Sequence, residues 1–168
     1  MKKIIESDRV YLRELLLSDV NNMLKLDKDP DVIKYLQPPK PDEEFYIKNI
    51  KVQNTYYNQN PGLGAWTAIN KSTGEYIGYF ALKYLKDTKD LEISYGLLKE
   101  HRKKGYCFEV SKKLVEYAFN NLKVKKLIGI AHPENEASLN VLQKLGMKFM
   151  EKKTHFGLPA LFHSIENN

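Results

Sequence analysis

The order of hydrophobic and polar positions divides the first sixty residues into one strand and three helices. Residues 9–15 alternate polar and apolar side chains, which is typical of a half-buried strand. Two short helices follow, one over 18–26 with N-cap chemistry at its first two residues and one over 29–36. A longer helix is predicted from 40–44, where proline and acidic residues come first, to Asn60.

From residue 64 the pattern changes to the period of a strand. Apolar segments at 64–69, 76–85 and 91–98 are separated by turn-forming residues at 70–75 and 86–90. Short strands joined by short polar turns favour an antiparallel meander.

The period becomes helical again from Gly105, because apolar side chains recur on one face as far as Leu122. Residues 126–131 then form an apolar strand. A helix between two strands predicts a βαβ unit, so we expect 91–98 and 126–131 to be parallel, with a right-handed crossover.

The end of the chain predicts one more helix and two closing strands. The helix ends at Gly146, a typical C′ residue, and the strands cover 148–155 and 160–165, joined by 156–159. The chain is therefore predicted to form one α/β domain over 1–168. Its central sheet is mixed and mostly antiparallel, with one parallel pair, and helices flank it.

Composition narrows the class of protein. The longest apolar runs are only a few residues, far below a membrane span, and charges come too early at the N-terminus for a signal peptide. A single cysteine excludes an internal disulfide, so a cytoplasmic location is expected. The net charge is +6, but 27 basic residues are interleaved with 21 acidic ones, which argues against nucleic-acid binding.

One basic cluster has a more specific context. Residues 101–104 (His-Arg-Lys-Lys) lie between a predicted strand and the helix that begins at Gly105. A helix N-terminus presents unpaired N–H groups and the positive end of the helix dipole, which together form a site for phosphate. The cluster therefore favours a phosphorylated small molecule as the ligand.

Two motifs in this order resemble the GNAT superfamily of N-acetyltransferases. The first is Arg-Lys-Lys-Gly-Tyr-Cys at 102–107, and the second runs from Asn-Glu-Ala-Ser at 135–138 to Gly-Met at 146–147. The segments 9–19 and 29–36 are similar to the branch that acetylates ribosomal-protein alanine or serine. The resemblance covers nearly the whole chain.

The resemblance implies acetyl-CoA as the cofactor and a splayed strand pair as its cleft. Backbone N–H groups from 102 to 108 would bind the pyrophosphate, 95–97 would pair with the pantetheine arm, and Asn135 would hydrogen-bond that arm. The implied cofactor-binding residues are Tyr95, Gly96, Leu97, Arg102, Lys103, Lys104, Gly105, Tyr106, Cys107, Phe108, Asn135 and Ser138. Simpler interpretations stay open: the basic side chains as a solvated rim, Gly105 as a loop glycine, and Asn135 as an N-cap.

Glu92 is the candidate general base. An amine must be neutral to attack a thioester, and a carboxylate on the central strand can take its proton. If burial desolvates Glu92, its pKa rises towards a useful range. It could also bind the substrate ammonium, or be an ordinary surface glutamate.

Three positions bear on the chemistry. Lys103 stands where many family members have a second glycine, and Leu142 stands where many have a tyrosine that protonates the leaving thiolate. Cys107 as a nucleophile is disfavoured because the pyrophosphate would cover it, and the four histidines lack metal-ligand spacing. No metal is therefore expected.

The expected reaction is acetyl transfer from acetyl-CoA to a primary amine by direct attack in a ternary complex. The acceptor is a protein N-terminus or a small-molecule amine, bound between 35–39 and 156–159, by a monomer or homodimer without membrane attachment. The alternatives are a non-catalytic acyl-CoA-binding or regulatory module and a basic RNA-associated factor, which would bind RNA in a salt-sensitive way.

Overall fold

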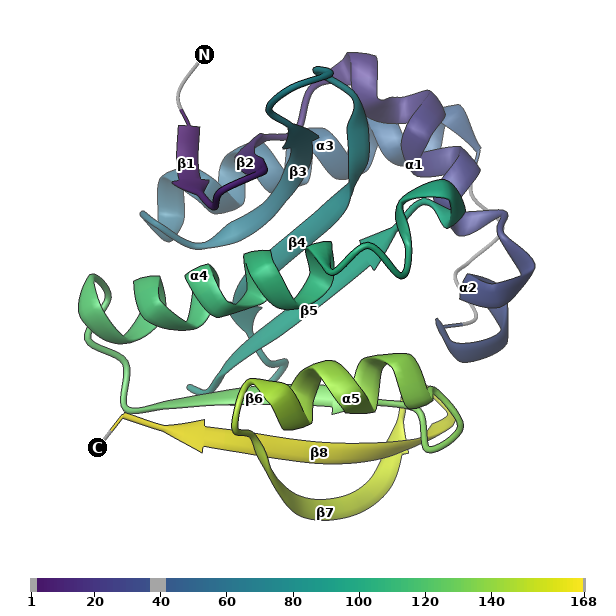
Figure 1. Cartoon of the computed structure of the whole chain (residues 1–168). Coiled ribbons are helices and arrows are strands. Elements are labelled where there is room, and N and C mark those ends of the chain that lie inside the picture. The colour runs from purple at the N-terminus through teal and green to yellow at the C-terminus, as the bar shows by residue number, and fades with distance from the viewer. Residues whose placement is uncertain (1–2, 37–41, 168) are drawn as a thin grey trace.

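The computed structural model describes residues 3–36 and 42–167, which form one eight-stranded sheet with helices on both faces (Figure 1). The strands lie in the order β1-β2-β3-β4-β5-β6-β8-β7. Their bounds are β1 Lys3–Glu6, β2 Val10–Glu14, β3 Gly64–Asn70, β4 Tyr76–Tyr84, β5 Leu91–Leu97, β6 Lys126–Ala131, β7 Lys148–His155 and β8 Leu158–Glu166. The helices are α1 Val20–Asp27, α2 Pro30–Leu36, α3 Glu43–Gln59, α4 Tyr106–Asn120 and α5 Glu136–Lys144.

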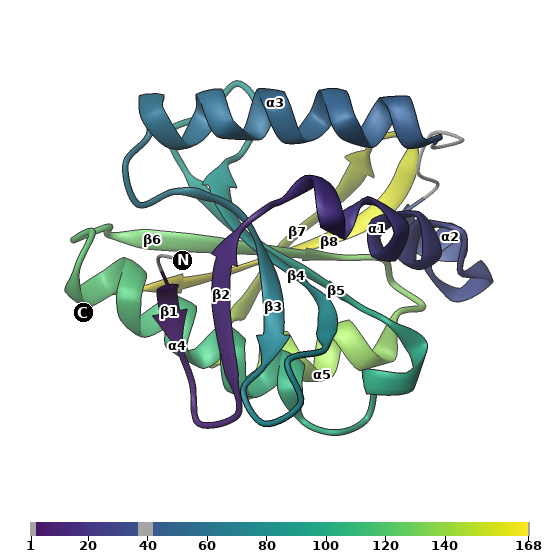
Figure 2. The ribbon, with the colours of Figure 1, turned by 90° about the horizontal axis from the view of Figure 1, so that it is seen from above.

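The helices divide between the two faces of the sheet. Seen from above, α3 lies on one side, and α4 and α5 lie on the other (Figure 2). The large core cluster includes Trp66, Phe80, Leu114 and Leu142, and so joins the sheet to α4 and α5. This arrangement follows from the apolar stripe of α4, which must be buried against a sheet face.

The sheet is antiparallel except at one place. Neighbouring strands β3, β4 and β5 form the expected meander, and the pair β5–β6 is parallel. The expectation of a mixed, mostly antiparallel sheet with one parallel pair is confirmed. In the described ranges no helix is long and apolar enough to cross a membrane.

Three details differ from the sequence-based expectation. Strand β1 was not expected. The closing hairpin turns at 156–157, so β8 begins at Leu158, earlier than predicted, and it inserts between β6 and β7. Asp19 does not cap α1 with its side chain; its carboxylate instead pairs with Arg13 inside the protein.

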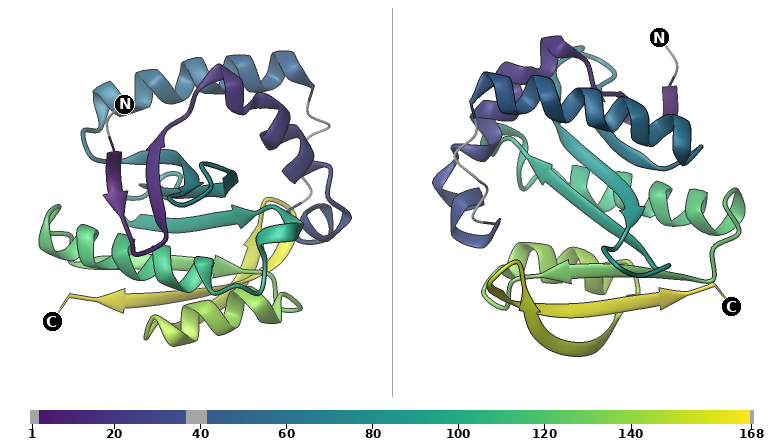
Figure 3. Two further views of the ribbon diagram at one scale, coloured as in Figure 1. Left: turned by 45° about the horizontal axis from the view of Figure 1, so that its top comes forward. Right: turned by 180° about the vertical axis from the view of Figure 1, so that it is seen from behind.

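Both short helices of the first half lie at the end of the sheet where β5 finishes and the loop to α4 begins (Figure 3). Helix α2 has no fully buried side chain, but Val32 packs against the cluster that includes Leu26. Ion pairs add to this contact: Arg102 pairs with Asp29 and Asp31, and Lys34 pairs with Glu134. The predicted start of α3 is confirmed at Glu43, with Asp42 as N-cap; residues 40 and 41 lie outside the described ranges.

Candidate functional site

The parallel pair β5–β6 separates partway along its length. Cross-strand pairing covers Leu91–Leu127, Glu92–Ile128 and Ile93–Gly129, although β5 continues to Leu97 and β6 to Ala131. Beyond Ile93 the second partner of β5 is missing in the part of the chain that the structure describes, while β4 stays paired with it throughout. The sequence-predicted residues 95–97 therefore lie on a strand with one open edge.

The loop between β5 and α4 contains a run of backbone amides without acceptors in the described part of the chain. The N–H groups of residues 103–108 have no acceptor among the described residues, and Gly105 is the N-cap of α4 without a side-chain cap. Arg102 differs, because its N–H donates to the carbonyl of Lys99 at 3.2 Å. The predicted donor set is thus brought together over 103–108, and Arg102 does not belong to it through its amide.

Two residues of this loop have left-handed backbone. Gly105 has φ +84°, and Lys103 has φ +59°. Glycine adopts this conformation without a steric penalty, whereas a lysine does not. A left-handed turn followed by a helix N-terminus gathers successive N–H groups into one concave anion site.

The side chain of Arg102 does not extend freely into solvent, as a residue of a solvated basic rim would. Its Nε donates to the Leu97 carbonyl at 3.0 Å, and its two terminal nitrogens contact Asp29 and Asp31 at 2.9 and 3.1 Å. Arg102 therefore joins the end of β5 to the start of α2. Lys103 and Lys104 are exposed at the rim, as expected.

Opposite the loop, the start of α5 completes the opening. The side-chain oxygen of Asn135 accepts from the Ser138 amide at 3.1 Å, so the N-cap interpretation of Asn135 is confirmed. The hydroxyl of Tyr95 lies 3.2 Å from Ser138 Oγ, so a side chain of β5 reaches α5. This contact links the open end of β5 to the first turn of α5.

Glu92 lies at the start of the separation, half-buried on the face opposite α4. Its cross-strand partner on β4 is Lys83. Burial raises the pKa of Glu92 to about 7, although the positive charge of Lys83 acts in the opposite direction. A carboxyl group that titrates near neutrality can both take and release a proton under ordinary conditions.

A model of the acetyltransferase (GNAT) domain matches residues 9–148. The chain belongs to the GNAT acetyltransferase family. The uncharacterized N-acetyltransferase YoaA of Bacillus subtilis (strain 168) is 27% identical over 150 residues, which cover 88% of this chain and 84% of that protein. The protein is therefore an acetyltransferase that uses acetyl-CoA.

Solved structures agree with this fold. A ribosomal-protein-alanine acetyltransferase from Vibrio fischeri superposes with a TM-score of 0.78 at 15% identity, over 97% of this chain and 96% of that one. A spermidine N-acetyltransferase from Vibrio cholerae, solved with CoA and spermine, gives 0.79 at 15% identity, over 95% and 96%.

The open edge of β5 and the loop that follows it fit acetyl-CoA, the cofactor of the GNAT family. An open strand edge, a left-handed turn and six amides without acceptors follow one another from β5 to the start of α4, and these are the groups that a diphosphate and an amide-containing arm require. Residues 103–108 would hold the diphosphate of CoA, and 95–97 with Asn135 would hold its arm.

Two further residues have structural roles in this GNAT domain. Leu142 is 1% exposed and its side chain packs over Gly129, so it is a core residue with no proton to offer. Burial raises the pKa of Cys107 to about 12, which keeps its thiol protonated and inert as a nucleophile.

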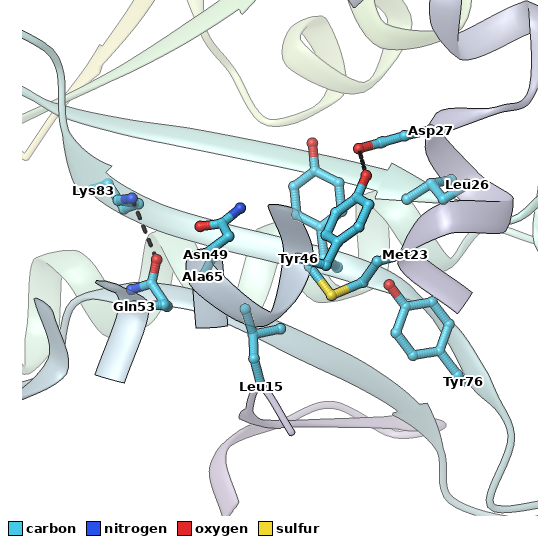
Figure 4. Close-up of a pocket in the computed structure, with 11 residues that line it drawn as sticks. Leu15, Met23, Leu26, Asp27, Tyr46, Asn49, Gln53, Ala65, Tyr76 and Lys83 are labelled. Atoms are coloured by element: carbon cyan, nitrogen blue, oxygen red, sulfur yellow. Dashed lines mark hydrogen bonds between the residues drawn. The ribbon is translucent and has the colours of Figure 1, made fainter. Parts of the chain in front are cut away.

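A cavity of about 220 Å³ lies on the Glu92 face, between α1, α3 and the strands β3 and β4 (Figure 4). Asp27, Tyr46, Tyr79 and Lys83 are among the residues that line it. Sequence reasoning missed this site, because its residues come from separate helices and strands with no shared motif.

The predicted acceptor pocket lay elsewhere, around 35–39 and 156–159. Residues 37–39 lie outside the described ranges. Tyr35 donates to the Glu134 carbonyl at 3.2 Å and stacks near His132, and Phe156 is largely exposed. The cavity under α1 and α3 is a second candidate for the acceptor site, and it lies on the Glu92 face.

Proposed function

We propose that this enzyme transfers the acetyl group to a primary amine, with Glu92 as the general base. The observation that carries the proposal is the half-buried Glu92 carboxyl. It lies beside the separation of β5 and β6, and its pKa is about 7. Family membership supports acetyl transfer, and the position and pKa of Glu92 support an amine as the acceptor.

Different residues bind the cofactor and take the proton of the acceptor. The amides of 103–108 hold the diphosphate, and Gly105 keeps the backbone close to it. Bound acetyl-CoA supplies an acetyl group activated as a thioester. Glu92 accepts a proton from the ammonium form of the acceptor, directly or through water, and so produces the neutral nucleophile. Holding the amine against the cofactor supplies much of the acceleration.

The acceptor is a protein N-terminus or a small-molecule amine. The two structural neighbours are named for acceptors of these two kinds: one is a ribosomal-protein-alanine acetyltransferase, and the other is a spermidine N-acetyltransferase. We place the reaction in the cytoplasm, since the chain has one cysteine, and we assign it to residues 1–168 as a single domain, as monomer or homodimer.

Thiol release tests this proposal. The protein is mixed with acetyl-CoA and a panel of amines, and free CoA thiol and the mass of the product are followed. We expect amine-dependent thiol release and a product heavier by one acetyl group. Thermal stabilisation by acetyl-CoA without turnover on any amine would contradict it and would favour a non-catalytic acyl-CoA-binding module.

A further inference from the structure

The cavity on the Glu92 face extends away from the proposed base. Lys83 lines the cavity, and it is also the cross-strand partner of Glu92. Tyr79 lines it as well, and the negative charge of Glu92 contributes to the raised pKa of its hydroxyl, after burial and Asp27. An acceptor whose amine reaches Glu92 therefore has the cavity next to it for the rest of the molecule.

At its far end the cavity contains a carboxylate without a counter-charge. Asp27 accepts a hydrogen bond from the Tyr46 hydroxyl (Figure 4), and among residues 3–36 and 42–167 it forms no ion pair. Burial raises the pKa of this carboxyl, and the Tyr46 hydrogen bond only partly offsets the effect. A half-buried carboxylate with no cation is costly, so this end favours a positively charged ligand.

Three tyrosines surround the same end. Burial raises the pKa values of Tyr46, Tyr76 and Tyr79, and the charge of Asp27 adds to each shift. Tyr76 is 8% exposed, and its hydroxyl has no hydrogen-bond partner among the described residues although it lines the cavity. Aromatic rings around a carboxylate, with a free hydroxyl oxygen, are the groups that bind an ammonium or guanidinium ion.

The end near Glu92 has the opposite character. The Lys83 ammonium donates to Gln53 Oε1 at 3.3 Å and lies 4.7 Å from the centre of the Tyr56 ring, so it is directed away from Asp27. The amide nitrogen of Gln53 is buried and has no acceptor within the described ranges. This end offers donors, so a cation in the cavity belongs beside Asp27.

We propose that Asp27, with Tyr46, Tyr76 and Tyr79, forms a subsite for a second positive charge on the acceptor. The preferred acceptors are then amines with a further ammonium or guanidinium group. Free diamines and peptides that begin with a basic residue both offer this chemistry. The inference rests on the proposed function, since it names the acceptor class of the same reaction.

Binding in the absence of acetyl-CoA tests the subsite by itself. Calorimetry compares 1,4-diaminobutane with n-butylamine on the whole protein. We expect the diamine to bind about tenfold more tightly. Asp27→Asn keeps the acceptor for Tyr46 and removes the charge, so the preference should vanish. Asp87→Asn, the same change in the exposed turn after β4, should keep it.

Kinetics then separate this inference from the proposed function. For the wild type we expect a higher kcat/KM with 1,4-diaminobutane than with n-butylamine, or with a lysine-first peptide than with its norleucine-first counterpart. In Asp27→Asn the two members of each pair should have similar kcat/KM values, while turnover of n-butylamine persists. Equal use of charged and uncharged partners by the wild type would overturn the subsite and leave the proposed function standing.

If Asp27→Asn fails to fold, Tyr76→Phe decides the question. It retains the ring and removes the free hydroxyl, so we expect several-fold weaker diamine binding with n-butylamine unaffected. Unchanged diamine affinity in that variant would count against the subsite.

Discussion

The Arg9 guanidinium and the Glu109 carboxylate form an ion pair, with 2.6 Å between Nη2 and Oε2. The pair joins the turn between β1 and β2 to the first turn of α4, one hundred residues away. The same Nη2 donates to the Lys104 carbonyl at 2.9 Å, and the Arg9 amide donates to Glu109 at 2.8 Å. Arg9 therefore fixes the loop that carries the free amides, through both its Lys104 carbonyl and the first turn of α4.

Replacing Arg9 should weaken CoA binding. In Arg9→Ala the Lys104 carbonyl loses its donor and the loop loses its tie to the β1–β2 turn. We expect the Kd for CoA to rise about tenfold in calorimetry, the scale of one charge-assisted hydrogen bond. Lys3→Ala, which breaks an exposed pair with Glu6, is the control and should bind normally. Equal affinities for the two variants would show that Arg9 does not position the loop.

The left-handed lysine in this loop makes a second prediction. Because Lys103 has φ +59°, Lys103→Gly should raise the free energy of unfolding by about 0.5–1 kcal/mol, as relief of the steric penalty exceeds the added freedom of the unfolded chain. Urea unfolding measures it. Lys104→Gly is the matched control, since Lys104 has no positive φ, and it should give no gain.

The sequence predicted most of the elements, because their signals are local. The apolar stripe ending at Leu122 placed α4, and Gly146, which has φ +82°, placed the end of α5. The βαβ pattern predicted the parallel pair. Strand β1 was missed, because Lys3–Glu6 is too short to show a period, and the insertion of β8 between β6 and β7 is a long-range pairing without a local signal.

The candidate site divides in the same way. The loop at 103–108 follows from a contiguous motif, and Glu92 follows from its place on the central strand. The partners of that loop are long-range: Arg9 contacts Lys104, and Arg102 contacts Asp29. The cavity around Asp27 joins separate helices and strands, so only the folded chain brings its residues together.

A buried ion pair in the N-terminal half should dominate stability there. Arg13 is 7% exposed and Asp19 is 3% exposed. Both carboxylate oxygens of Asp19 accept hydrogen bonds from the Arg13 guanidinium. One of these oxygens also accepts from the Thr67 hydroxyl and the Leu16 amide. Asp19→Asn leaves the guanidinium buried without its counter-charge. We expect a loss of about 3–5 kcal/mol in urea unfolding at pH 7. Glu6→Gln, in an exposed pair, should lose less than about 1 kcal/mol.

The same pair fixes a pH dependence. Burial would raise the pKa of Asp19, but the hydrogen bonds from Arg13, the Leu16 amide and Thr67 outweigh burial and hold it below 3.8. A lowered folded-state pKa contributes stability above the unfolded value, and that stability disappears as the pH falls through the folded value. The wild type and Asp19→Asn should therefore converge only below about pH 3.8. A constant difference at all pH values would contradict this electrostatic role.

The pH dependence of kcat/KM tests the role of Glu92 most directly. A base acts only when ionised, so the rate of acetyl transfer to an amine should rise through a limb with its midpoint near 7 in the wild type. Glu92→Gln should abolish that limb and lower kcat/KM by about 10²–10⁴-fold, whereas Glu44→Gln, an exposed glutamate on α3, should leave both unchanged. A Glu92→Gln enzyme with the wild-type rate and the same limb would contradict the account.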